Sequence, residues 1–149
     1  MLCMNNYEPA YINECRTRVQ AQLTAYHTLV AAASKHDDQP LNNAFTAFEP
    51  VFFNNMVLLL DQLFVHRSRA LELKDGNPLN EVRVLCNSLL TNNGKLVADK
   101  QIKLNPTKSV LGYKVGDEIN LSEADFIRLS GAFFAEIEKK FLLVEPMPA

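Results

Sequence analysis

Arg67 is the residue of this sequence whose charge fits its predicted surroundings least. It follows Leu60 by seven residues and Leu63 by four, so a helix that continues this far directs the guanidinium into an apolar core. A buried charge is costly unless it is paired and hydrogen-bonded. We weigh a structural role, either an ion pair with an acid such as Glu81 or Asp75 or a cap on helix carbonyls, against a site for a carboxylate or phosphate ligand. We favour the structural role, because ion pairs also place charges inside folds.

The polar residues that surround Arg67 in sequence are candidates for a ligand pocket. The candidate ligand-binding residues are Arg67, Arg69, Asn77, Asn80 and Arg83. A predicted helix N-terminus at Pro78 would add amide donors that favour an anion, and cationic neighbours would keep His66 neutral, as a general base requires. The same residues could equally form a solvated corner. No Ser, Cys or Asp stands at the spacing of a nucleophile or partner, so the sequence leans toward a protein without catalytic activity.

A second group of charges lies between Lys95 and Lys114. Five lysines face one acid, Asp99, which gives this segment a local charge of +4. Lysines protect the edge of a sheet from unwanted pairing, and that is our first interpretation; contact with an acidic partner or a nucleic acid is the alternative. The net charge of −2 argues against a dedicated nucleic-acid binder, and with Tyr113 as the only aromatic residue in this segment it lacks a stacking platform.

The histidines and cysteines do not match a known metal or redox site. The three histidines are His27, His36 and His66, and the three cysteines are Cys3, Cys15 and Cys86. They include neither a His-x-x-x-His pair nor a Cys-x-x-Cys pair, so we expect no metal, no cofactor and no disulfide. The apolar run Met56–Leu60 is too short to span a membrane. A reducing cytoplasm is the expected location.

Helical periodicity predicts four helices that position these residues. The predicted ranges are 9–36, 50–73, 78–91 and 123–141. Pro40 is expected to end the first helix and Pro50 to start or kink the second. Asn77 is the predicted N-cap of the third helix, and Ser122 with Asp125 forms a predicted capping box for the fourth.

The segment before the last helix has a different pattern. Tyr113 and Val115 alternate with polar residues, as do Ile119 and Leu121, and Gly116-Asp117 lies between the two pairs. This pattern predicts a β-hairpin. The predicted fold class is therefore mainly α (α+β), with a four-helix bundle-like core and a small antiparallel β-hairpin inserted before the last helix. We expect a single domain over residues 1–149, with flexible ends at 1–8 and 144–149.

The apolar helices lead to a functional hypothesis. We expect the segment from Phe52 to Phe64 to carry more apolar surface than a lone bundle can cover. We therefore expect a non-enzymatic self-associating or protein-interaction module, with a homodimer that buries part of the first or second helix. The first alternative is a small-molecule anion binder or enzyme with a pocket around Arg67 and His66. The second alternative is weak association with nucleic acid through the Lys95–Lys114 segment.

Overall fold

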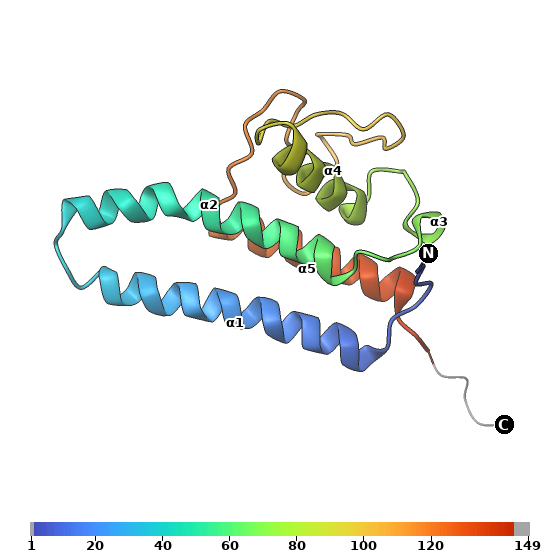
Figure 1. The fold of residues 1–149 in the computed structure, drawn as a ribbon, viewed down its shortest axis with the longest axis horizontal. Helices are drawn as coiled ribbons and strands as arrows, with labels where there is room; N and C mark the ends of the chain where they lie inside the picture. The colour runs from blue at the N-terminus through green and yellow to red at the C-terminus, as the bar shows by residue number, and fades with distance from the viewer. Residues whose placement is uncertain (1, 145–149) are drawn as a thin grey trace.

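The protein is built from helices around a central pair (Figure 1). The computed structural model describes residues 2–144. Its helices are α1 (Pro9–Ala33), α2 (Gln39–Leu63), α3 (Arg69–Glu72), α4 (Pro78–Thr91) and α5 (Glu123–Phe141). The central pair is α2 and α5, with α1 packed on one side and α4 on the other, and the single turn α3 contacts α5. Among the described residues, no helix is both long and apolar enough to cross a membrane.

Aromatic side chains form the centre of the core. The rings of Phe53 and Phe126 lie 5.7 Å apart between centroids, and those of Phe64 and Phe133 lie 5.8 Å apart. The predicted stripe on α1 is buried as far as Tyr26; its buried members are Ile12, Cys15, Val19, Leu23 and Tyr26. Val30 and Ala33, the other predicted members, are only partly buried, so the burial of α1 decreases toward its C-terminal end. Cys15 and Cys86 are buried, Cys3 is exposed, and all three thiols are free.

The start and the end of α2 differ from the prediction. Asp38 accepts a hydrogen bond from Leu41 N at 3.1 Å, so α2 begins at Gln39 and Pro40 lies in its first turn. Proline is tolerated there because the first amides of a helix have no intrahelical partner. Pro50, the predicted start, instead lies inside the helix. At the other end α2 stops at Leu63, so the predicted continuation to residue 73 is wrong.

The predicted β-hairpin is wrong, and with it the α+β class. The turn itself exists: Asp117 N donates to Lys114 O at 3.0 Å, and Gly116 has a φ of 94°. Beyond the turn, however, Leu96 N donates to Asp117 O and Gly116 N donates to Leu96 O, both at 2.9 Å. The chain after α4 thus takes the place of the expected partner strand. Residues 2–144 contain isolated bridges but no strand.

A side chain of α2 explains why the second arm of that hairpin does not pair with the first. Asn54 Nδ2 donates to Ile119 O at 2.8 Å, and Leu121 N donates to Asn54 Oδ1 at 3.1 Å. Ile119 and Leu121 are buried, so the alternating sequence pattern correctly indicates which side chains of this segment face the core. The Asn54 amide side chain thus satisfies the Ile119 carbonyl and the Leu121 amide, while Ile119 N donates to Gly94 O at 2.8 Å. Local alternation cannot reveal such a distant partner.

Residues 4–7, near the start of the described chain, lie beside the end of α5. Met4 N donates to His66 O at 2.7 Å, and Leu143 N donates to Tyr7 O at 2.9 Å. Residues 4–7 thereby connect the segment after α2 with the end of α5. Flexibility of residues 1–8 stays a prediction, and Met1 and residues 145–149 lie outside the described residues.

The N-cap of α4 provides a test of the fold. Asn77 Oδ1 accepts from Leu79 N at 2.9 Å and from Asn80 N at 3.3 Å, which confirms the predicted cap. Replacing Asn77 with Ala should lower the free energy of unfolding by about 1 kcal/mol, the usual value for a lost cap. Urea denaturation measures the change, with Asn13→Ala on the exposed face of α1 as the control. Equal stability of the two variants would contradict the role of Asn77.

Candidate functional site

Arg67 is buried, as its spacing predicts, although the chain around it is not helical. It is only 3% exposed, and its guanidinium Nε donates to Glu72 Oε1 at 2.6 Å. Its terminal nitrogens donate to the backbone carbonyls of Phe64 at 3.1 Å and Leu79 at 3.3 Å. Asp61 lies 2.9 Å away as an ion-pair partner, without the angles of a hydrogen bond. The positive charge is thus compensated within the fold.

Neither acid predicted as a partner for Arg67 contacts it. Glu81 is buried and accepts hydrogen bonds from Val110 N at 2.7 Å and Leu111 N at 2.9 Å. Burial raises the pKa of Glu81 even though these two amides lower it. Asp75 instead accepts from Asn77. The role of Glu81 is to attach the loop before α5 to α4.

Several predicted site residues converge on Glu72, which the sequence analysis did not select. Its side chain is fully buried. Asn80 Nδ2 donates to Oε2 at 2.8 Å, and Arg83 donates to both oxygens, at 3.0 Å and 2.7 Å. We name Asp61, Arg67, Glu72, Asn80 and Arg83 the Glu72 cluster. Glu72 lies between Leu71 and Leu73, and a glutamate flanked by leucines is the only signal in the sequence that points to its burial.

The Glu72 cluster balances its own charges. Two arginines face two carboxylates. Burial alone raises the pKa of Glu72, but the hydrogen bond from Arg83 and the charges of Arg67 and Arg83 outweigh burial and hold the pKa below its ordinary value of 4.5. An anionic ligand would have to displace the Glu72 carboxylate, because both arginines are already paired with it. The geometry therefore favours the structural interpretation of Arg67.

Leu73 has a backbone conformation that leucine rarely adopts. Its φ is 68° and its ψ is −174°, a region occupied almost exclusively by glycine. Such strain costs on the order of 1–3 kcal/mol and persists only where neighbouring contacts enforce it. Here Asn80 Nδ2 donates to Leu73 O at 3.0 Å while also bonding Glu72. The Glu72 cluster thus fixes the strained turn between α3 and α4.

The other candidates lie apart from the Glu72 cluster. Arg69 is exposed at the start of α3. His66 is also exposed and lines a surface hollow of about 500 Å³ with Tyr7, Tyr11 and Leu63 among others. His66 and Arg67, adjacent in sequence, therefore do not face one another across a pocket. In the described part of the chain, no group of three or more His, Cys, Asp or Glu side chains is placed to bind a metal ion.

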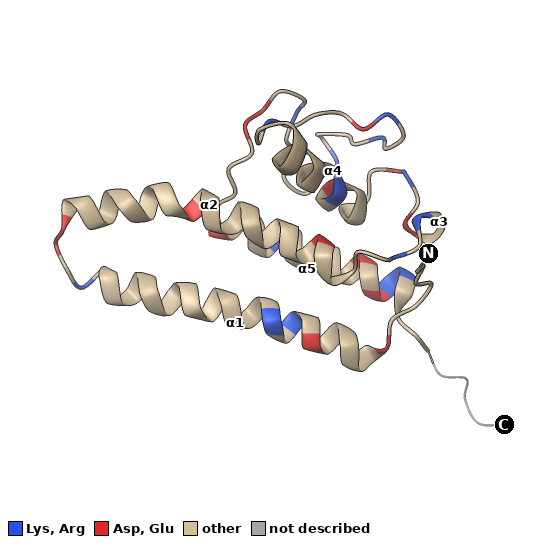
Figure 2. Cartoon of the chain, in the orientation of Figure 1, with Lys and Arg blue, Asp and Glu red and all other residues tan. Residues whose placement is uncertain are grey.

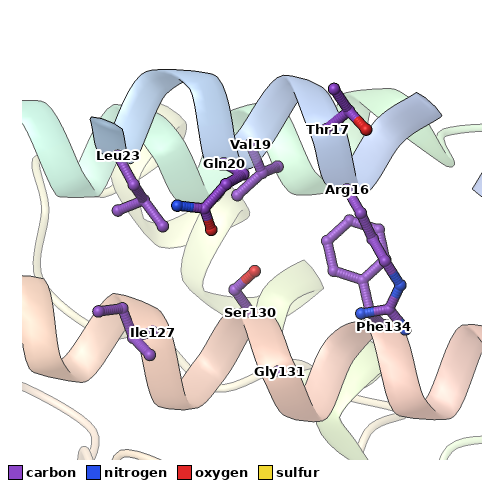
Figure 3. Close-up of a pocket in the computed structure, with 9 residues that line it drawn as sticks. All are labelled: Arg16, Thr17, Val19, Gln20, Leu23, Ile127, Ser130, Gly131 and Phe134. Carbon is purple, nitrogen blue, oxygen red and sulfur yellow. The ribbon is translucent and has the colours of Figure 1, made fainter. Parts of the chain in front are cut away.

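A groove between α1 and α5 is a second concave feature (Figure 3). Its volume is about 360 Å³, and Ser130 and Gly131 of α5 lie in its floor opposite Val19 and Leu23 of α1. Arg16 lies at one end, but it is paired with Glu138 and stacks over the Phe134 ring at 4.7 Å; the complete lining is Arg16, Thr17, Val19, Gln20, Leu23, Ile127, Ser130, Gly131 and Phe134. The groove offers neither a nucleophile–base pair nor a free charge.

The most unusual surface lies at the opposite end of the molecule from α3. Residues 27–52, which we name the α1–α2 tip, contain no buried side chain. In Figure 1 this part of α1 and α2 projects beyond α4 and α5. Phe48 and Val51 are 42% and 57% exposed. A hollow of about 320 Å³ there is lined only by apolar residues: Leu29, Leu41, Ala44, Phe45 and Phe48.

No protein-family model, curated protein or solved structure matches this chain. Its function must therefore be inferred from the Glu72 cluster, the lysine-rich segment and the α1–α2 tip. The lysines of the segment, Lys95, Lys100, Lys103, Lys108 and Lys114, are all exposed. They lie on irregular chain and not on the edge of a sheet, so the sheet-protection interpretation falls with the β-hairpin.

Removal of Arg67 tests its structural role. Arg67→Ala leaves part of the Glu72 charge uncompensated in the interior, so the free energy of unfolding should fall by about 3–5 kcal/mol. Chemical denaturation of this variant and of the exposed neighbour Arg69→Ala gives the comparison; the latter should change stability by less than about 0.5 kcal/mol. A neutral Arg67→Ala, or sulfate that raises the melting temperature of the wild type alone, would favour anion recognition instead.

The lowered pKa of Glu72 predicts how stability depends on pH. Because the folded pKa lies below the unfolded one, the ionised carboxylate stabilises the protein above the unfolded value, and this contribution disappears as the pH falls through the folded value. Glu72→Gln should therefore be less stable than wild type at neutral pH, and the difference should shrink well below pH 4.5. Denaturant titrations at both pH values, with the exposed Glu14→Gln as control, measure it. A difference independent of pH would disprove the assignment.

Proposed function

We propose that this chain is a non-enzymatic module that self-associates through the α1–α2 tip. One observation carries the proposal: two long helices continue past the core and expose apolar side chains on uncovered surface. Soluble monomers rarely expose large contiguous apolar patches, and such patches mark interaction sites. Burying apolar surface gains about 25 cal/mol per Å², which provides the driving force for association.

The charge distribution supports the same proposal. Within the α1–α2 tip the charged residues are Lys35, Asp37, Asp38 and Glu49. The first three lie at or beside the turn between the helices, so the flanks of both helices are almost free of charge (Figure 2). The centre of a protein interface is depleted of charged residues and enriched in aromatic ones, and Phe45 and Phe48 fit that composition.

The Glu72 cluster supports a structural rather than a catalytic role for the rest of the molecule. Its arginines are paired with its own carboxylates, and the strained turn at Leu73 is fixed by Asn80. Acid–base catalysis would need a general base within hydrogen-bonding reach of the group that it deprotonates. His66 contacts no member of the Glu72 cluster through its side chain. The interaction surface is therefore the feature with the strongest physical argument.

Self-association is tested by mass in solution. Sedimentation equilibrium at micromolar concentrations should give an average mass above the monomer value of 16.8 kDa for the wild type. Phe48→Glu places a charge in the contact and should shift the protein to the monomer. Leu90→Glu, which alters a 70% exposed leucine on α4, is the matched control and should behave as wild type. A wild type that remains monomeric at high concentration would refute the proposal.

A further inference from the structure

The exposed residues of α2 within the α1–α2 tip follow a heptad pattern. Leu41, Ala44, Phe48 and Val51 are separated by three, four and three residues. This is the spacing of the a and d positions through which two helices of a coiled coil pack. Helical rise makes this stripe about 15 Å long. Ala44, Phe48 and Val51 are exposed and Leu41 is partly exposed, so the fold leaves most of this seam uncovered; Leu41, Ala44 and Phe48 border the hollow that Leu29 of α1 also lines.

We infer that the partner on this seam is α2 of a second copy, running antiparallel around a two-fold axis near Thr46. The inference specifies the partner and geometry of the proposed interface and therefore rests on the proposed function. In this register Leu41 meets Val51 of the other copy, and Ala44 meets Phe48. Each pair occurs twice, as an isologous interface requires. A large side chain faces a small one in the central layers, which is the arrangement that packs without voids.

The flanks of the seam are compatible with this register. Around the two-fold axis each flank of the seam meets the same flank of the other copy, so Phe45 approaches Phe45 and Ala47 approaches Ala47, and all are uncharged. Glu49 is the one charged residue between positions 41 and 51, so the register places no charge directly opposite another. Phe45 and Phe48 also line the apolar hollow of the α1–α2 tip, which the second copy would fill.

The position of the core determines the antiparallel direction. The buried part of α2 begins at Phe53, where α4 and α5 pack against it. In Figure 1 these helices cover the later half of α2 and leave most of the α1–α2 tip uncovered; the start of α5 reaches it at Glu49, which accepts a hydrogen bond from Glu123 N at 2.9 Å. An antiparallel pair places the two cores at opposite ends of the dimer, whereas a parallel pair would place them at the same end. The short seam gives an interface below about 1,200 Å² in total, typical of a weak, reversible dimer.

Disulfide trapping distinguishes the two directions. One copy carries Leu41→Cys and a size tag and the other carries Val51→Cys, both in a Cys3→Ser background that removes the exposed native thiol. Under mild oxidation, a linked heterodimer should form in the mixture and be absent from either variant alone. A mixture of Leu41→Cys with Val115→Cys, an equally accessible loop position, is the control and should not link.

The outcomes separate this inference from the proposed function. Linkage of Leu41→Cys to itself would establish a parallel pair and overturn the inference. A dimer by sedimentation with no linkage in any mixture would place the interface elsewhere and also overturn it, while self-association stands. A monomer in all samples would refute both. Circular dichroism and melting temperatures matching wild type show that the cysteine variants are folded.

Discussion

The buried carboxylate of Glu72 is the constraint on which one half of this molecule depends. A charge in the interior must be compensated by groups that cannot move away, so its partners are fixed in space. Arg67 comes from the segment after α2, and Asn80 and Arg83 come from α4. Lys140 of α5 reaches the Glu72 carbonyl at 2.9 Å. A single residue thereby sets the relative positions of the ends of three long helices.

The α1–α2 tip contrasts with this arrangement. At the Glu72 end charged groups are buried and paired with one another, whereas at the tip Leu29, Phe48 and Val51 are exposed. α1 joins the core by its apolar stripe, by the ion pair between Arg16 and Glu138, and by the contact of His27 with Glu123 of α5. The α1–α2 tip and the Glu72 cluster lie at opposite ends of the molecule (Figure 1). Under the proposed function, the residues that stabilise the fold and the residues that bind a partner are therefore separate.

Features encoded by neighbouring residues were predictable from the sequence. Asn77 and Ser122 cap their helices as expected, because a cap depends on a few consecutive residues. Arg67 is buried as expected but not for the expected reason, because α2 ends at Leu63 and the contacts to Glu72, Phe64 and Leu79 hold the guanidinium inside. The β-hairpin failed because Asn54 and the chain near Leu96, both distant in sequence, take its backbone hydrogen bonds. Glu72 was missed because its burial results from the packing of the turn between α2 and α4.

Pro50 divides α2 close to the point where the core begins. Pro50 has no amide proton, so the carbonyl of Thr46 lacks its helical hydrogen bond. The missing bond lies just before Phe53, the first buried residue of α2. Short helices without tertiary contacts are marginal in water. In a lone copy, the amides before Pro50 should therefore exchange with solvent deuterium through local opening, while those after Phe53 exchange only when the whole domain unfolds. Assembly would merge these two cooperative units into one.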